Sequence, residues 1–152
     1  MALAGKMDKK DYRVYTLLGD GEIQEGQVWE ASMFAGAKHL DNLCVIVDNN
    51  NLQIDGPIGE VNSPYPIDDK FKAFNFHVIN IDGHNFDEIR MALNEAKTIK
   101  GQPTAIIMKT VKGKGVSFME NNAGWHGSAP NDEQYAIAMA DLEKVGEALC
   151  QK

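Results

Sequence analysis

The chain has 152 residues, of which 43% are hydrophobic, which suits one soluble domain with a real core and is short for two domains. Its formal net charge of −7 argues against broad binding to nucleic acids or to anionic membranes, because both repel an anionic protein that lacks a strong basic patch. No run approaches the roughly 18 apolar residues of a membrane span and no secretory signal is evident, so we expect a cytoplasmic protein.

Four mostly apolar runs predict strands, at residues 13–18, 43–47, 77–81 and 104–110. Helical patterns separate them: one follows the first strand, one begins after the N-cap Asn85, and the last begins after Asn131. The apolar faces expected for the last two helices are Phe86, Ile89, Leu93, Ala96 and Ile99, then Tyr135, Met139, Leu142, Val145 and Leu149. Strands that alternate with helices predict an α/β fold with a parallel sheet flanked by helices.

Polar residues stand where the first two predicted strands end. Asp20 lies between Gly19 and Gly21, and Asn50 follows 30 positions later, about the length of one β-α-β unit. Both side chains should therefore reach one edge of the sheet, where a carboxylate and an amide oxygen suit Mg²⁺ or Ca²⁺. The glycines would tolerate positive φ and let a diphosphate approach the backbone. Each signal alone is common in ordinary turns, and only the combination is specific.

Other chemistry-bearing residues have a structural and a functional interpretation. Lys109, Lys112 and Lys114 either assist phosphate binding or lie in a solvated loop. His84 follows a strand and is assigned to a turn, and Cys44 lies within an apolar run and is assigned to the core.

Several segments resemble transketolase: GDGEIQEGQVWEA, VDNNNLQIDG, IDGH, KTVKGKGVSFMENNAGWHG and APNDEQY. GDG at residues 19–21, followed after 27 residues by Asn49 and Asn50, looks like the thiamine diphosphate signature. The resemblance covers essentially the whole chain and is closest to the N-terminal subunit of bacterial transketolases that are split into two chains. It implies the thiamine diphosphate-binding fold, with residues 1–152 as a single diphosphate-binding (PP) domain.

The resemblance also implies a role for each matching residue. Asp20, the side chain of Asn50 and the backbone carbonyl of Leu52 would be metal ligands. The cofactor-binding residues would be Gly19, Asp20, Gly21, Glu22, Asn50, Ile54 and His126. Gly21 would lie against the diphosphate and Ile54 near the thiazolium ring.

Two residues are implied to act in catalysis. His126, in the Gly-Trp-His-Gly loop, would face the diphosphate and the sugar, and a neutral imidazole suits hydrogen bonding and proton transfer there. Glu25 matches a glutamate at the subunit interface of the family, near the network that couples paired active sites.

The implied activity is transfer of a two-carbon ketol unit from a ketose phosphate to an aldose phosphate, as in the pentose phosphate pathway. The implied cofactors are thiamine diphosphate and Mg²⁺ (or Ca²⁺). The implied partner is a C-terminal, pyrimidine-binding subunit in a dimer or heterotetramer. The chain lacks the upstream glycine-rich segment of the family, so we expect a domain that is incomplete on its N-terminal side, with an unpaired sheet edge, and inactive alone.

Two alternatives remain open. The chain could belong to another thiamine diphosphate enzyme, such as a deoxyxylulose-phosphate synthase or a 2-oxoacid dehydrogenase component. It could also be a noncatalytic interaction module.

Overall fold

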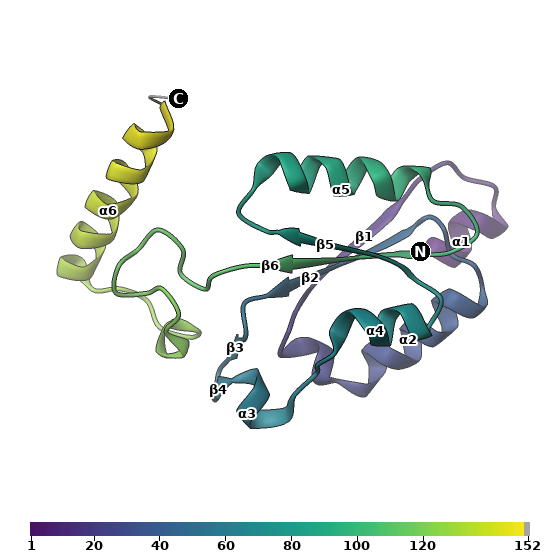
Figure 1. Cartoon of the computed structure of the whole chain (residues 1–152), viewed down its shortest axis with the longest axis horizontal. Helices are drawn as coiled ribbons and strands as arrows, with labels where there is room; N and C mark the ends of the chain where they lie inside the picture. The colour runs from purple at the N-terminus through teal and green to yellow at the C-terminus, as the bar shows by residue number, and fades with distance from the viewer. Residues whose placement is uncertain (151–152) are drawn as a thin grey trace.

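A parallel sheet of four strands forms the centre of the computed structural model, which describes residues 1–150 (Figure 1). The strands are β1 (Val14–Gly19), β2 (Leu43–Asn49), β5 (His77–Asp82) and β6 (Thr104–Lys109). Their order is β1-β2-β6-β5, and all three pairings are parallel. The α/β class and the four strands that the apolar runs predict are confirmed.

Helices cover both faces of this sheet. Helices α2 and α4 lie on one face and α5 lies on the other (Figure 1). The helices are α1 (Ala2–Met7), α2 (Gly26–Ala37), α3 (Ile58–Asn62), α4 (Ile67–Ala73), α5 (Phe86–Thr98) and α6 (Asp132–Cys150). The short elements are the 3-10 turns η1 (Glu22–Gln24) and η2 (Ala123–Trp125) and the strands β3 (Leu52–Gln53) and β4 (Gly56–Pro57).

Alternate residues of the central strands point to opposite faces, so the sheet buries two apolar clusters. The cluster under α2 and α4 includes Val45 and Val47, and it is completed by Phe71, whose ring centroid lies 5.3 Å from that of Trp29. The cluster under α5 includes Cys44 and Ile106. Burial raises the pKa of the Cys44 thiol to about 11, and its assignment to the core is confirmed.

The expected apolar face of α5 is wrong at its first residue. Ala92 and Ala96 are buried, but Phe86 is 84% exposed. Asn85 caps α5 by accepting hydrogen bonds from the backbone N–H groups of Asp87 and Glu88. The helix thus begins just beyond the carboxyl end of β5, where its first side chain has no sheet beneath it.

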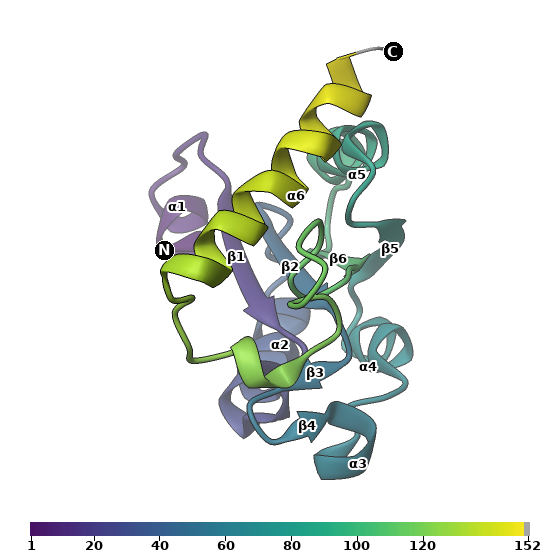
Figure 2. The same cartoon turned by 90° about the vertical axis from the view of Figure 1, so that its left-hand side faces the viewer.

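Helix α6 stands away from the sheet, as two perpendicular views show (Figures 1 and 2). The helix itself is confirmed, but its expected apolar face is exposed: Tyr135, Met139, Leu142, Val145 and Leu149. Asp141 ties the helix to the preceding loop, since its carboxylate accepts hydrogen bonds from the backbone N–H and the hydroxyl of Ser117. Among residues 1–150, no helix is long and apolar enough to cross a membrane.

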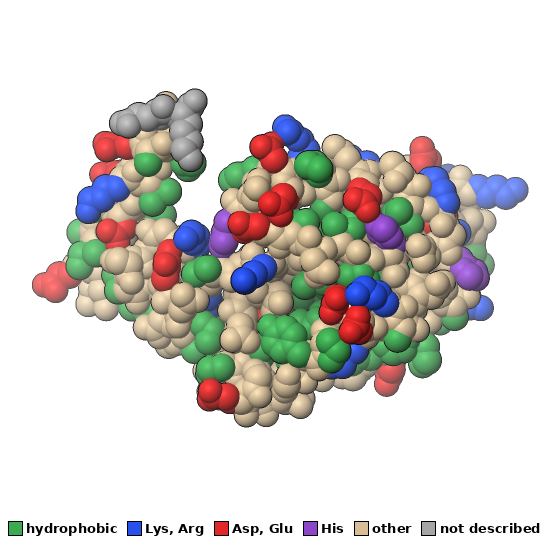
Figure 3. Space-filling view, viewed as in Figure 1, with side chains coloured by type: hydrophobic (Ala, Val, Ile, Leu, Met, Phe, Trp, Pro, Cys, Tyr) green, Lys and Arg blue, Asp and Glu red, His purple; other side chains and the backbone are tan. Residues whose placement is uncertain are grey.

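Strands β1 and β5 lie at the two edges of the sheet. On one face of β1, Tyr15 and Leu17 are 44% and 66% exposed. The space-filling view shows acidic and basic side chains interspersed over one face of the molecule, with hydrophobic side chains between them (Figure 3). That the domain is incomplete on its N-terminal side stays a prediction.

Replacing Gly36 by alanine should destabilise the fold. A Cβ atom at this position in α2 would lie 1.9 Å from the carbonyl oxygen of Phe74, the C-cap residue of α4. Helix α2 would therefore have to move away from the end of α4. We expect Gly36→Ala to lower the free energy of unfolding by about 2 kcal/mol, measured by urea denaturation. Gly26→Ala in the same helix is the control, because a Cβ there meets nothing within 4 Å. Equal stabilities of the two variants would contradict this packing.

Candidate functional site

A cavity of about 450 Å³ opens at the carboxyl ends of β1 and β2. Its lining residues are Gly19, Asp20, Gly21, Glu22, Asp48, Asn50, Leu52, Gln53, Ile54, Lys112 and His126. Every residue predicted to bind metal or cofactor is among them. Glu25 is not; it is exposed at the N-cap of α2. We call this space the Asp20 cavity. Crevices at the carboxyl ends of parallel strands are where open α/β sheets bind ligands.

Asp20 is the most deeply buried polar group at the cavity, with 1% of its surface exposed. Its Oδ1 accepts a hydrogen bond of 2.9 Å from the Gly21 amide, and its Oδ2 accepts one of 2.5 Å from the Asn51 amide. Burial raises the pKa of Asp20, and the nearby Asp48 carboxylate adds to that rise, while the two amide hydrogen bonds oppose it. A buried carboxylate beside a second acid is stabilised when a cation binds between them.

The turn after β2 delivers the second predicted ligand. The Oδ1 atom of Asn50 accepts a 3.0 Å hydrogen bond from the Leu52 amide, which fixes the side chain in an Asx turn. Asn51 adopts φ of +65°, in the left-handed region, and this conformation directs its amide to Asp20. The prediction that the 30-residue spacing brings Asp20 and Asn50 to the same edge of the sheet is thus confirmed, since both line one cavity. Their role as metal ligands stays a prediction.

The glycines beside Asp20 act differently from what the sequence suggests. Gly21 has φ of −70°, so it does not need the left-handed region. A Cβ atom at Gly21 would instead lie 2.8 Å from the Cβ of Gln53, so the missing side chain lets β3 pack against the turn. At Gly19 the nearest atom would be 3.9 Å away, and its amide donates to the Glu22 carboxylate. The interpretation of these glycines as positive-φ residues is therefore wrong.

A long loop after β6 adds positive charge to the cavity. Lys112 Nζ lies 3.3 Å from His126 Nδ1. An ammonium group only donates, so Nδ1 accepts and the proton of a neutral His126 ring sits on Nε2. The sequence allows Lys112 to be either a phosphate ligand or a solvated residue, and the structure places it in the lining of the Asp20 cavity. Asp48 and Gln53 also line the cavity and give no signal in the sequence.

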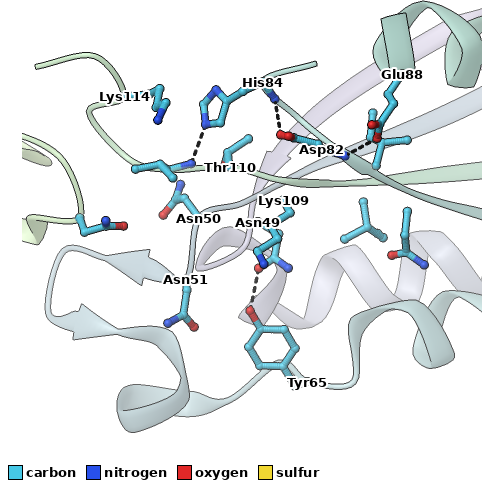
Figure 4. A pocket seen from close by; sticks show the side chains of 15 residues that line it. Asn49, Asn50, Asn51, Tyr65, Asp82, His84, Glu88, Lys109, Thr110 and Lys114 are labelled. Carbon is cyan, nitrogen blue, oxygen red and sulfur yellow. Dashed lines mark hydrogen bonds between the residues drawn. The ribbon is translucent and has the colours of Figure 1, made fainter. Parts of the chain in front are cut away.

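The other two lysines line a neighbouring cavity of about 1030 Å³ at the carboxyl ends of β2, β5 and β6 (Figure 4). There Tyr65 donates a 2.8 Å hydrogen bond to Asn49 Oδ1, and burial raises the pKa of its hydroxyl. The Nζ atom of Lys114 lies 3.6 Å from Oε1 of Glu120. Lys109 and Lys114 therefore do not share the cavity of Lys112.

The residues around Asp20 fit a magnesium ion that is shared with a phosphorylated ligand. Mg²⁺ is usually held by one or two protein carboxylates, with phosphate and water oxygens completing its octahedron. Among residues 1–150, no group of three acidic, histidine or cysteine side chains could hold a metal by itself. One buried carboxylate, an amide oxygen and a nearby ammonium group suit a cation that arrives with an anionic ligand.

Comparison with known proteins shows which family the chain resembles. The family described as "Transketolase, thiamine diphosphate binding domain" matches residues 4–143. The chain is 48% identical to the 6-deoxy-6-sulfo-D-fructose transketolase subunit SqwG of Clostridium sp. (strain MSTE9), over 96% of this chain and 53% of that protein. It is 41% identical to one subunit of the apulose-4-phosphate transketolase of Phocaeicola vulgatus, over 98% of this chain and 53% of that protein. The chain thus spans about half the length of these two relatives.

The solved structures agree with this comparison. Transketolase from Campylobacter jejuni superposes with a TM-score of 0.83 at 35% sequence identity. The match covers 91% of this chain and 22% of that chain. The similarity therefore extends from sequence to the arrangement of the sheet and its helices.

Replacing Gly21 by alanine should displace β3 from the cavity. We expect Gly21→Ala to shift the amide resonances of Gln53 and Ile54 and to lower the free energy of unfolding by about 1–3 kcal/mol, because a Cβ would overlap Gln53. Gly19→Ala, where the nearest contact is ordinary, is the control. If both variants shift these resonances equally, the packing of β3 against Gly21 is not what requires a glycine.

Proposed function

The chain belongs to the transketolase family and contains its thiamine diphosphate-binding domain, and we propose that it binds the diphosphate end of this cofactor, with a divalent cation, in the Asp20 cavity. The observation that carries the proposal is the burial of Asp20 at a cavity that also holds Asn50, Lys112 and His126. An acid that is 1% exposed and has a raised pKa is costly unless a cation offsets its charge.

We assign the cation to Asp20, to Oδ1 of Asn50 and to the backbone carbonyl of Leu52. Asn50 is held for this role by its bond to the Leu52 amide, and Asp20 by two backbone amides. Mg²⁺ suits this set of three protein ligands because its six coordination positions leave room for diphosphate oxygens. Ca²⁺ would accept the same oxygen ligands with a looser geometry.

The diphosphate itself would be held by positive charge and hydrogen-bond donors. Lys112 supplies an ammonium group, and His126 supplies an Nε2–H donor because its Nδ1 accepts from Lys112. Gly19, Gly21 and Glu22 line the same cavity from the end of β1. Ile54, 68% exposed at the cavity, offers an apolar surface for the thiazolium ring.

The reaction we propose is the transfer of a two-carbon ketol unit between sugars. Bound thiamine diphosphate supplies the nucleophilic carbon for this chemistry. The protein groups would position the cofactor and the sugar. Asp20 and Asn50 would hold the cation, and His126 would donate a hydrogen bond to the diphosphate or to a substrate hydroxyl.

A second polypeptide is part of the proposal. The two relatives above are named as subunits, and each is about twice as long as its matched region. We infer a companion subunit with a pyrimidine-binding domain, in a dimer or heterotetramer. We propose that Glu25, which is exposed at the N-cap of α2, contacts such a partner.

The substrates we infer are sugars with an anionic terminal group. One relative is named for a sulfonated fructose and the other for a phosphorylated sugar, so the anion is a phosphate or a sulfonate. A place in the pentose phosphate pathway and a cytoplasmic location stay predictions.

Ketol transfer can be measured directly. The full chain, purified with its companion subunit, is supplied with thiamine diphosphate, Mg²⁺, a ketose phosphate and an aldose phosphate. We expect a ketose longer than the aldose by two carbons, and loss of this product when EDTA removes the metal. Pyruvate decarboxylation without sugar transfer would favour another thiamine diphosphate enzyme, and absence of cofactor binding would favour a noncatalytic module.

Asp20→Asn should weaken the cofactor binding that depends on the metal. The substitution keeps the size of the side chain but removes its charge and one of the two oxygens that accept the Gly21 and Asn51 amides, so unfolding in urea is measured beside affinity. We expect cofactor affinity in the presence of Mg²⁺ to fall at least about tenfold by calorimetry. Asp55→Asn is the matched control, because Asp55 is exposed between β3 and β4 and does not line the cavity. If Asp20→Asn binds the cofactor as tightly as the parent, the cation is not held by Asp20.

A further inference from the structure

His84 connects the end of β5 to the loop that carries Lys112 and His126. Its Nε2 atom accepts a 2.8 Å hydrogen bond from the backbone amide of Val111 (Figure 4). Val111 is the residue directly before Lys112 and lies just beyond the end of β6. The prediction that His84 lies in a turn is confirmed, but the turn also contacts the loop of the Asp20 cavity.

The turn that presents His84 is held rigidly. The His84 amide donates to Asp82 Oδ1 at 2.9 Å, and the Asp82 amide donates to Glu88 Oε2 at 2.8 Å. Gly83 lies so close to β6 that a Cβ there would be 2.4 Å from the Cγ2 atom of Thr110. The imidazole therefore stands on a fixed base beside the end of β6.

The loop beyond Val111 is compact, so its base determines where its functional side chains lie. The Asn121 amide donates to the Lys112 carbonyl at 3.0 Å, which closes the loop on itself. Farther along, the indole of Trp125 donates to the Phe118 carbonyl at 3.0 Å, and the two rings pack edge to face. A shift of the base at Val111 would move this folded unit, and Lys112 and His126 with it.

We propose that His84 is a positioning residue for cofactor binding: its bond to the Val111 amide sets the base of the loop that brings Lys112 and His126 to the Asp20 cavity. The inference rests on the proposed function, since it concerns the same cavity. His84 lines the neighbouring cavity and is absent from the lining of the Asp20 cavity, so it acts through the loop.

The chemistry of the bond defines the substitutions that test it. Val111 N–H donates, so Nε2 of His84 carries no proton and acts as an acceptor. Phenylalanine keeps a ring but leaves the amide without this partner. Glutamine places an amide oxygen near the position of Nε2 and restores an acceptor. Comparing the two variants therefore distinguishes the effect of a bulky side chain from the effect of a hydrogen-bond acceptor.

The test compares His84→Phe and His84→Gln in the full chain, with His77→Phe as the control. His77 lies at the other end of β5 and pairs with Glu95, so its replacement also removes a histidine contact but leaves the loop untouched. Three quantities are measured: hydrogen exchange of the Val111 amide, the resonances of the His126 ring, and affinity for thiamine diphosphate with Mg²⁺ by calorimetry.

We expect His84→Phe to weaken cofactor binding by about fivefold and to speed exchange of the Val111 amide by a similar factor, as the loss of one exposed hydrogen bond would do. His84→Gln should return both quantities to within about twofold of the parent, and His77→Phe should change neither. The His126 resonances should move in His84→Phe alone.

Either of two results would overturn the role of His84. One is unchanged Val111 exchange and unchanged His126 resonances in His84→Phe; the other is equal loss of affinity in the glutamine and phenylalanine variants. If the parent binds no cofactor, the proposed function fails, but the exchange and resonance measurements still decide whether His84 positions the loop.

Discussion

The buried carboxylate of Asp20 is the interaction on which the site depends. Asp20 directly follows β1 and accepts a hydrogen bond from the Gly21 amide. It also accepts one from the Asn51 amide, which fixes the turn that follows the neighbouring β2. This bond joins Asp20 and Asn51, which are 31 residues apart in the chain and lie just beyond the ends of two neighbouring strands. Because the group is 1% exposed, its negative charge is retained at a cost that a bound cation relieves. The buried Asp20 carboxylate therefore both organises the end of the sheet and favours binding of a positive charge there.

The remaining groups reach the cavity from a different part of the fold. Lys112 and His126 arrive on the loop after β6, which is anchored at its base by Thr110 and Val111. The Thr110 amide donates to the Asn49 carbonyl and its hydroxyl donates to Asp48, while the Val111 amide donates to His84. The acidic and basic sides of the cavity are therefore built by separate segments, and their relative position is set by contacts at the end of one strand.

The sequence predicted those parts of the fold and the site that depend on local patterns. Strands buried on both faces appear as apolar runs, and residues that end two adjacent parallel strands meet at one edge, so Asp20 and Asn50 could be placed together. It could not reveal why Gly21 is a glycine, because the Cβ that would clash meets Gln53, which is distant in the chain. Nor could it show that Lys109, at the end of β6, lines a different cavity from Lys112 in the loop that follows. The exposure of Phe86, the first residue of α5, was likewise not predictable.

The charge balance at the cavity favours the proposed binding of a metal and a diphosphate as one unit. Asp20 is a single carboxylate, and Asn50 and Leu52 add only neutral oxygens, so a free cation gains too few strong ligands to displace its water. A free diphosphate would face Asp20 and Asp48 with only Lys112 and His126 to attract it. In the proposed complex, a cation would neutralise Asp20 and Asp48, and Lys112 would offset the phosphate charge that remains. Each ligand would then raise the affinity for the other, because Asp20 is buried and, among the described residues that line the cavity, Lys112 carries the one ammonium group.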